Sequence, residues 1–301
     1  MERRAYGKTD MQTSVLGFGG SEIGFGGAEQ ATVEKMLNEA LDAGLNVIDT
    51  AECYVDSEEK IGLAVGHRRD DFYLFTKCGH ASHTGLDMPD WSPELIRASI
   101  DNSLRRLRTD RVDMVHLHSC GIDVLEKGDV VRELLAARDA GKTRYVGYSG
   151  DSATARYALE MGVFDSLQTS VNIADQECIE LTLPYCVEHG IGVVAKRPVA
   201  NVAWKNGSRE PDSGYAMTYW RRLQKLAYPF LSESFSSSLE VALRFTLAQP
   251  GVCTMIVGTK DPSRWAANAA AVGKGVLPAD EVLAIRRLWA EVCEADWVGQ
   301  G

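Results

Sequence analysis

Short apolar segments rich in β-branched residues alternate along this chain with longer segments whose apolar residues recur at helical spacing. Residues 32–43 are of the longer kind, since Val33, Met36 and Leu37 fall on one helical face and Gly44 follows the segment. Residues 46–49 come next and have the short, apolar character of a buried strand. The pattern therefore predicts strands and helices in alternation.

About eight strand and helix pairs fit into the 301 residues. The predicted strands are residues 15–19, 46–49, 72–76, 112–117, 144–148, 166–170, 191–195 and 253–257. The predicted helices are residues 32–43, 92–108, 130–140, 152–161, 179–188, 238–247 and 266–271. One further helix is predicted to begin at Ser57. This count predicts an α/β fold, a closed (β/α)₈ TIM barrel that forms a single domain over residues 1–301. An open doubly wound sheet would have fewer strands and a GxGxxG turn after the first one, whereas the glycines of residues 17–27 lack that spacing.

Three segments lie outside the predicted barrel. Residues 1–13 predict a small lid at the barrel bottom, and residues 277–297 predict an extra amphipathic helix. Residues 201–237 predict a long polar loop after the seventh strand. Loops that follow strands lie on the catalytic face of a barrel, so we expect this loop to lie over the active site.

Composition and charge narrow the class of protein. With 45% hydrophobic and 25% charged residues the chain is typical of a globular protein, and no run of 18 apolar residues predicts a membrane span. A net charge of −10 argues against a nucleic-acid partner, which requires basic clusters. The seven cysteines form no CxxC pair, which favours reduced thiols and a cytoplasmic location.

Four polar residues follow three consecutive predicted strands and are the candidates for chemistry: Asp49, Tyr54, Lys77 and His118. In a barrel they would converge at the catalytic face. An ammonium such as Lys77 favours a phenolate, so it is expected to lower the pKa of Tyr54 and make it a usable proton donor, while Asp49 holds Lys77 in place. Each residue also has an ordinary structural interpretation, as a turn cap, a surface side chain or a hydrogen-bonded histidine.

A rival interpretation uses His116 and His118. A His-x-His pair at a strand end also begins the metal site of some barrel hydrolases, which would make the protein a zinc enzyme. Such a site needs further ligands at later strand ends, and His189 falls at a helix end instead. A third interpretation is a non-catalytic relative that keeps the barrel and its pocket for sensing or for binding a partner.

Longer motifs surround the four candidates. Residues 46–62 read NVIDTAECYVDSEEKIG, which resembles the DTAxxY and SExxxG signature of the aldo-keto reductases. Residues 75–77, 113–118 and 141–149 resemble the family's lysine strand, histidine strand and GKIRxIGVS strand, and residues 257–268 resemble its cofactor segment. The resemblance spans about residues 16–268. It implies that Tyr54 donates the proton, that Lys77 and Asp49 adjust the pKa of Tyr54, and that His118 orients the carbonyl.

The resemblance further implies a nicotinamide cofactor, a small carbonyl or alcohol substrate and no metal. Ser149 and Gln168 would surround the nicotinamide amide. Two positions depart from the family pattern: Gly150 stands where asparagine is common, and Lys196 stands where an aromatic ring usually stacks. Lys196 and Arg197 instead suit the diphosphate, because barrels often bind phosphate on the loops after strands seven and eight; the alternative is a basic pair in a solvated loop. The remaining expected cofactor residues are Gly19, Gly20, Asp49, Gly258, Thr259, Lys260, Arg264 and Asn268.

The segment after the eighth strand bears on the choice of cofactor. Arg264 lies one helical turn before Asn268, and the resemblance places both at the adenosine phosphate and adenine. A 2′-phosphate needs fixed positive charge, which Arg264 and Lys260 supply, so NADP(H) is expected provided that Asp261 turns away to cap the helix. The substrate, the direction of reaction and the oligomeric state stay open at this point.

Three thiols lie beside the candidate residues. Cys53 adjoins Tyr54, Cys78 follows Lys77, and Cys120 lies beyond His118. If Lys77 favours a thiolate, these cysteines are expected to be sensitive to oxidants and alkylating agents. The alternative is that they are small buried packing residues.

Overall fold

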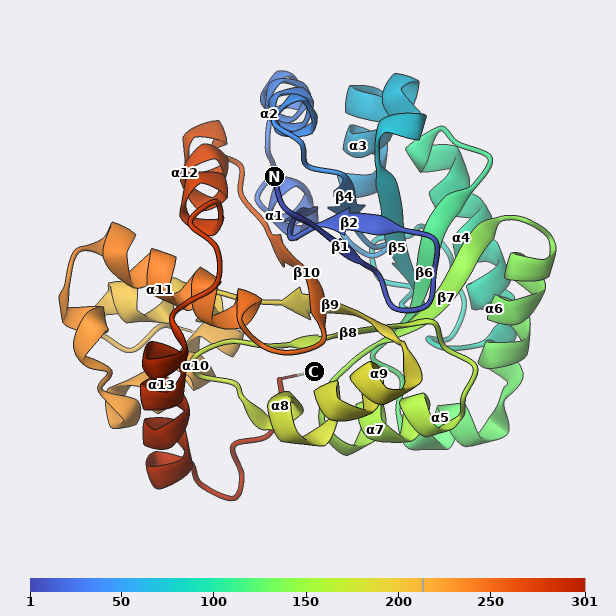
Figure 1. The fold of residues 1–301 in the computed structure, drawn as a ribbon. Helices are drawn as coiled ribbons and strands as arrows, with labels where there is room; N and C mark the ends of the chain where they lie inside the picture. Colours follow the sequence, from blue (N-terminus) through green and yellow to red (C-terminus); the bar gives the residue numbers. More distant parts are fainter. Residues whose placement is uncertain (213, 301) are drawn as a thin grey trace.

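Eight parallel strands close into a barrel in the computed structural model, which describes residues 1–212 and 214–300 (Figure 1). Leu16 of the first barrel strand lies opposite Met255 of the last, and this pairing closes the ring. The predicted (β/α)₈ barrel is confirmed. Its strands are β3 (Leu16–Gly19), β4 (Val47–Asp49), β5 (Tyr73–Cys78), β6 (Val112–His118), β7 (Thr143–Ser149), β8 (Ser166–Ser170), β9 (Gly192–Lys196) and β10 (Val252–Val257).

An outer ring of helices covers the barrel, close to where the hydrophobic spacing predicts them. Ser92 caps α4 by accepting a hydrogen bond from the backbone of Leu95. The predicted helix 179–188 is instead two helices, because Pro184 suits the first turn of a new helix but not a helix interior. The ring comprises α2 (Gln30–Asp42), α3 (Ser57–Val65), α4 (Pro93–Leu107), α6 (Asp129–Asp139), α7 (Ser152–Glu160), α8 (Glu177–Leu181), α9 (Leu183–His189), α11 (Phe235–Leu247) and α12 (Pro262–Val272).

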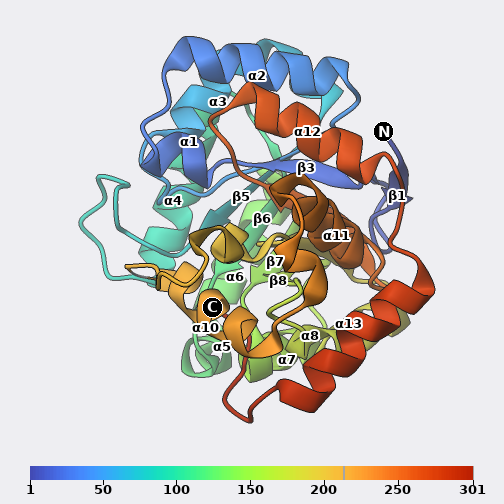
Figure 2. The same ribbon diagram turned by 90° about the vertical axis from the view of Figure 1, so that its left-hand side faces the viewer.

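The N-terminal segment lies across the end of the barrel where the strands begin, as predicted. Strands β1 (Arg3–Ala5) and β2 (Gln12–Ser14) form a hairpin that faces the viewer in Figure 1 and lies on the right in Figure 2. The buried Tyr6 hydroxyl bonds to Ser166 Oγ, which also lies 2.8 Å from His116 Nε2. This end of the barrel is therefore filled by side chains, and chemistry belongs to the other end.

The segment after β9 is largely helical, where the sequence predicted a polar loop. It contains η2 (Ala200–Asn206), α10 (Gly214–Leu226) and η3 (Pro229–Ser232). Helix α10 buries Tyr219, Leu223 and Leu226 on one face, in a cluster that includes Trp289 of α13 (Ala279–Val292), the predicted extra helix. A few apolar positions at helical spacing are enough to dock an otherwise polar helix. The sequence also did not predict α1 (Ser21–Phe25), η1 (Gly66–Asp71) or α5 (Ile122–Lys127).

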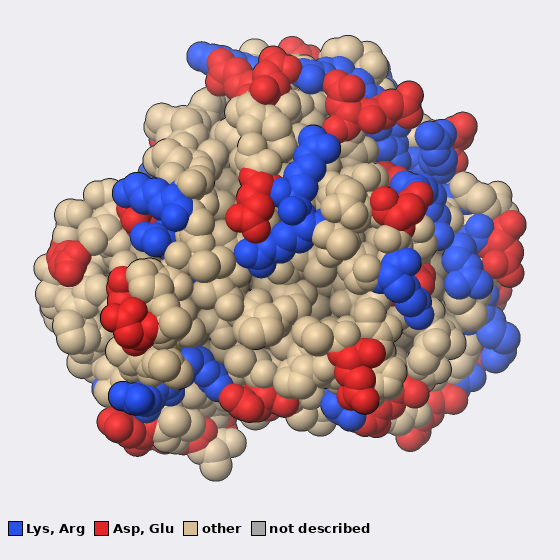
Figure 3. Space-filling model, viewed as in Figure 1, with Lys and Arg blue, Asp and Glu red and all other residues tan. Residues whose placement is uncertain are grey.

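Charged side chains of both signs are interleaved on the hairpin face (Figure 3). Several pair across elements: Arg144 bonds to Asp113 of β6 at 2.9 Å and to Asp10 at 2.6 Å. Arg69 bonds to the second oxygen of Asp113 at 2.7 Å. Within the described part of the chain, no helix has the length and apolar character needed to cross a membrane.

Candidate active site at the barrel mouth

A buried ion pair lies where β4 and β5 end. Lys77 Nζ donates to Asp49 Oδ2 at 2.6 Å and to the backbone oxygen of Thr50 at 2.7 Å. Burial lowers the pKa of Lys77, but the negative charge of Asp49 and the coupling to Tyr54 raise it by more, so the net pKa lies above its usual value. The lysine is therefore a fixed ammonium at neutral pH.

Tyr54 lies beside this pair. Lys77 Nζ is 5.1 Å from the Tyr54 ring centroid, and the ring of His118 meets Tyr54 edge-on with centroids 5.9 Å apart. The structure thus brings all four predicted residues together. Burial raises the pKa of Tyr54 by more than Lys77 lowers it, so the net shift is opposite to the one expected from the sequence. The phenol consequently keeps its proton at neutral pH and is able to donate it.

His118 ends β6 and is neutral. Burial, and to a smaller extent the nearby ammonium of Lys77, lowers the pKa of His118 well below its usual range. Its backbone oxygen accepts a hydrogen bond from Trp91 Nε1 at 3.0 Å, and its Nδ1 lies 3.6 Å from Cys53 Sγ. A neutral imidazole next to a phenol can orient a carbonyl oxygen by hydrogen bonding.

His116 has a structural role. It is buried inside the barrel, where Nε2 lies 2.8 Å from Ser166 Oγ and the ring stands 6.1 Å from that of Phe75. Gly147 gives it room, since a Cβ there would lie 2.4 Å from the His116 ring. The group of possible metal ligands found in residues 1–212 and 214–300 contains His118 with Glu52 and Cys53, and not His116. The two histidines of the His-x-His pair therefore do not share one group of possible metal ligands in the described residues.

Gln168 is the buried group that most clearly needs a ligand. It lies on β8 opposite Ser149 of β7, and neither its Oε1 nor its Nε2 has a hydrogen-bond partner. Asp49 Oδ1 is buried too and has no hydrogen bond of good geometry, while the nearby Gln168 side chain opposes the rise in the pKa of Asp49. An unsatisfied buried polar group costs about 1–3 kcal/mol, so three such atoms at one barrel mouth fit a ligand that offers both donors and acceptors. A nicotinamide carboxamide has this character.

Lys196 and Arg197 are engaged by the protein. Lys196 Nζ lies 2.7 Å from Asp151 Oδ2 in a buried pair, and burial lowers the pKa of Lys196 by more than Asp151 raises it. Arg197 donates to Ser170 Oγ at 2.8 Å and also to the backbone oxygen of Gln300. Its guanidinium lies 3.7 Å from the ring centroid of Tyr215. The predicted diphosphate pair thus contacts other protein groups in this structure.

Arg197 contacts the chain segment of residues 298–300, which was not predicted from the sequence to lie at the mouth. Gly299 N donates to Glu177 Oε2 at 2.6 Å, and Arg222 Nη2 donates to Val298 O at 2.7 Å. The backbone N–H of Gln300 donates to Oδ2 of the buried Asp175. Burial raises the pKa of Asp175 to about 7. Buried and half-buried polar side chains therefore hold this segment at the barrel mouth.

The loops after β3 and β10 pack against each other. A Cβ at Gly19 would lie 3.3 Å from the backbone of Gly258, and one at Gly20 would lie 2.6 Å from Ser57 Oγ. Lys260 Nζ donates across the gap to Gly26 O at 3.1 Å. Both glycines are thus explained by close packing of the protein itself.

Helix α12 begins as the sequence suggested. Asp261 caps it by accepting from Ser263 N at 2.9 Å, and Thr259 Oγ1 accepts from Asp261 N at 3.0 Å. Arg264 is 69% exposed, with its Nε 3.5 Å from Asp261 Oδ2, whereas Asn268 is buried. The guanidinium of Arg264 remains accessible to an anion from solvent.

Aromatic residues at the mouth were missed by sequence reasoning. Phe25 is 58% exposed, and its ring lies 5.6 Å from Tyr54 and 5.8 Å from His83. Trp91 stands 4.9 Å from His80, whose ring lies 4.8 Å from His118. These residues follow predicted strands, and this position could have indicated that they lie at the catalytic face.

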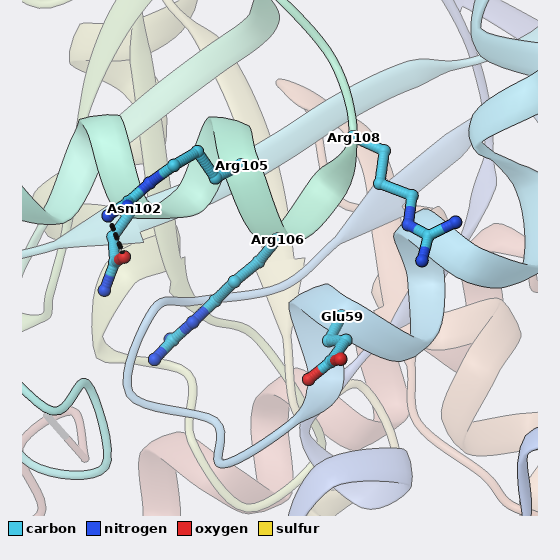
Figure 4. Close-up of a pocket in the computed structure, with 5 residues that line it drawn as sticks. All are labelled: Glu59, Asn102, Arg105, Arg106 and Arg108. Carbon is cyan, nitrogen blue, oxygen red and sulfur yellow. Dashed lines mark hydrogen bonds between the residues drawn. The ribbon is translucent and has the colours of Figure 1, made fainter.

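A pocket of about 290 Å³ lies between α3 and α4 and is lined by Glu59 and a group of α4 residues (Figure 4). One of these, Arg106, crosses to the loop after β4 and donates to Glu52 O at 3.1 Å and to Thr84 O at 2.7 Å. It lies 3.8 Å from the buried Glu58 carboxylate. Arg106 therefore anchors the backbone two residues before Tyr54.

The three thiols near the site are buried, contrary to the reactive role that the sequence suggested. Burial raises the pKa of Cys53 and of Cys120 to about 12, and raises the pKa of Cys78 well above its usual value. Lys77 lowers the pKa of Cys53 by less than burial raises it. We expect iodoacetamide at neutral pH to label the exposed Cys293 first, as mass spectrometry of tryptic peptides would show. Equal labelling of Cys53 would contradict this result.

Val55 follows Tyr54 with φ at 52°, a conformation unfavourable to a β-branched residue. Its side chain is 39% exposed, so little packing is lost when it is removed. We expect Val55→Gly to raise the free energy of unfolding in urea by about 1 kcal/mol. Val55→Ala keeps the Cβ and is the control; a similar gain in both variants would show that the left-handed backbone is not the cause.

Comparison with known proteins agrees with this geometry. Residues 15–290 match the Aldo/keto reductase family. The chain is 30% identical to L-galactose dehydrogenase of Arabidopsis thaliana, covering 90% of this chain and 88% of that protein. It is 26% identical to the NADH-specific methylglyoxal reductase of Escherichia coli (94% and 97% covered). The holo form of an aldo-keto reductase from Bacillus halodurans superposes with a TM-score of 0.82, at 29% identity and with 96% of each chain covered. The chain belongs to the aldo-keto reductase family and resembles oxidoreductases within it.

Proposed function

We propose that this protein interconverts an aldehyde or ketone and the corresponding alcohol with NADP(H), and that Tyr54 is the general acid and base. The observation that carries the proposal is the contact of Tyr54 with the buried Lys77–Asp49 pair on one side and with His118 on the other. This constellation provides a proton donor, a fixed positive charge and a hydrogen-bonding group at one place.

Each residue then has a distinct task. Tyr54 gives its proton to the carbonyl oxygen as negative charge develops there, and Lys77, 5.1 Å from the ring, stabilises the phenolate that remains. The pairing with Asp49 keeps Lys77 in position and charged. Neutral His118 orients the carbonyl oxygen and cannot compete as an acid, since its pKa lies well below the usual range.

The cofactor, when bound, supplies the hydride. The unpartnered carboxamide of Gln168, with Ser149 opposite it, suits the nicotinamide amide. Gly19, Gly20, Gly258 and Thr259 belong to the loops expected beside it. Lys260, Arg264 and Asn268 are proposed to bind the adenosine end, and Lys196 and Arg197 reach the diphosphate only if their contacts with Asp151 and Gln300 rearrange.

A test of this proposal is turnover followed by nicotinamide absorbance. Methylglyoxal and L-galactose are sensible first substrates, because relatives that resemble this chain are named for them. A wider panel of aldehydes, ketones and alcohols should follow, with each cofactor and in both directions. Absence of turnover across the panel, in protein shown to be folded, would refute the proposed activity.

Arg264→Ala is expected to weaken NADPH binding about 10- to 150-fold and NADH binding far less. The reason is that a hydrogen bond to a charged group contributes about 1.5–3 kcal/mol, and only NADPH carries the 2′-phosphate. Fluorescence titration of both cofactors measures the effect, with the exposed Arg287→Ala on α13 as a matched control. Both cofactors are titrated because one relative, from Escherichia coli, is named as NADH-specific. If the wild type binds NADH more tightly, or if the substitution weakens binding of both cofactors equally, Arg264 does not bind the 2′-phosphate.

A further inference from the structure

Three groups of different chemistry converge beside the proposed catalytic tyrosine. Glu52 and Cys53 lie on the loop after β4, and His118 ends β6. Each offers one ligand atom, and these atoms lie within 4.8 Å of one another. We propose that Glu52, Cys53 and His118 form a binding site for a single zinc ion, separate in purpose from the carbonyl chemistry and inhibitory to it.

The distances fit a tetrahedral ion. Zinc bonds to thiolate sulfur at about 2.3 Å and to imidazole nitrogen at about 2.0–2.1 Å, which places the two ligand atoms about 3.6 Å apart at a tetrahedral angle. Cys53 Sγ and His118 Nδ1 are 3.6 Å apart. This edge of the site is therefore already formed, and only the Glu52 carboxylate needs to turn toward it.

Glu52 is available for this turn. Its side chain is fully buried, its Oε1 accepts from His80 N at 3.0 Å, and its Oε2 has no hydrogen-bond partner. Arg106 holds the Glu52 backbone oxygen, so the residue's main chain is fixed while the second carboxylate oxygen is unsatisfied. A buried carboxylate oxygen without a donor is costly, and a cation beside it removes that cost.

The ligand types select the metal. Thiolate and imidazole favour zinc over magnesium or calcium, which prefer oxygen. On binding, the Cys53 thiol and the Glu52 carboxyl, where it carries a proton, release their protons to solvent, and the resulting thiolate and carboxylate together balance the two positive charges of the ion. Asp49, 2.6 Å from Lys77 Nζ, offsets part of the repulsion between Lys77 and the ion. His118 is partly exposed, so an ion can reach it from the mouth, and a water would complete the tetrahedral coordination.

The functional consequence follows from the shared histidine. With Nδ1 bound to zinc, the His118 ring is held by the metal, and a dication lies next to the position where Tyr54 must deliver its proton. We expect zinc to inhibit turnover reversibly; this step alone rests on the proposed function.

Cobalt(II) titration of the purified full-length protein, without cofactor or substrate, tests the site directly. We expect one equivalent to bind with a near-ultraviolet thiolate-to-cobalt absorption, which the exposed-thiol control Cys293→Ser retains and Cys53→Ser loses. Glu52→Gln should keep the absorption but weaken cobalt binding at least about tenfold, since loss of an outer-sphere partner alone costs 10–100-fold. Absence of the absorption in the wild type, its persistence in Cys53→Ser, or unchanged affinity in Glu52→Gln would overturn the proposal.

Zinc inhibition is then measured within each variant as the ratio of turnover with and without the ion. The ratio should fall in the wild type and in Cys293→Ser, return to one on addition of a chelator, and stay near one in Cys53→Ser. Inhibition of equal strength in Cys53→Ser would place the inhibitory zinc elsewhere and refute the proposal. Because the cobalt spectrum needs no turnover, failure of the carbonyl reaction would not be mistaken for failure of the metal site.

Discussion

Tyr54→Phe is expected to lower kcat for carbonyl reduction by about 10²–10⁴, the usual contribution of a positioned general acid. The substitution removes one hydroxyl and leaves the ring that packs between Lys77 and His118. Cofactor affinity should therefore stay nearly unchanged. Steady-state kinetics together with a fluorescence titration of NADPH separates the two quantities.

Tyr73→Phe provides a matched control, because its hydroxyl lies at the opposite end of the barrel, where it accepts from Gln12 N at 3.2 Å. We expect that variant to keep wild-type turnover. Retention of most of the activity by purified Tyr54→Phe would exclude Tyr54 as the proton donor, and a matching loss in Tyr73→Phe would point to a general structural defect.

Lys77→Met is expected to abolish turnover and to lower the free energy of unfolding by about 3–5 kcal/mol at alkaline pH, as breaking a buried ion pair does. Methionine fills much of the space but leaves the Asp49 carboxylate without its partner at 2.6 Å and the Thr50 oxygen without its donor. Urea unfolding followed by circular dichroism measures this stability change.

The loss of stability in Lys77→Met should depend on pH in a defined direction. Burial already raises the pKa of Asp49, and removing Lys77 removes the main opposing influence. A carboxyl whose folded pKa lies above its unfolded value destabilises the protein as the pH rises, so the variant should regain stability as the pH falls through that folded pKa. The double variant with Asp49→Asn should regain stability without regaining turnover. A pH-independent loss in the single variant would show that the unpaired charge is not its cause.

Sequence periodicity was sufficient for the barrel because each strand is a short apolar run and each helix has a stripe of apolar residues. It was insufficient for α10, whose polar composition hides the face formed by Tyr219, Leu223 and Leu226. Likewise, the convergence of four residues could be predicted once a barrel was assumed, because they follow adjacent strands: Asp49, Tyr54, Lys77 and His118. The upward pKa shift of Tyr54 could not be foreseen, since burial is a property of the folded chain. The partner of Lys196, Asp151, lies 45 positions earlier with no local pattern to link them.

The pairing of β3 with β10 has a consequence for how the protein forms during synthesis. Leu16 has its parallel neighbour at Met255, so one edge of β3 has no partner until β10 has left the ribosome, more than 230 residues later. Non-local pairings of this kind form slowly, and an unpaired apolar strand edge favours aggregation in the meantime. Expression at lower temperature, or with added chaperones, should therefore raise the yield of native protein more than it alters the stability of protein already folded.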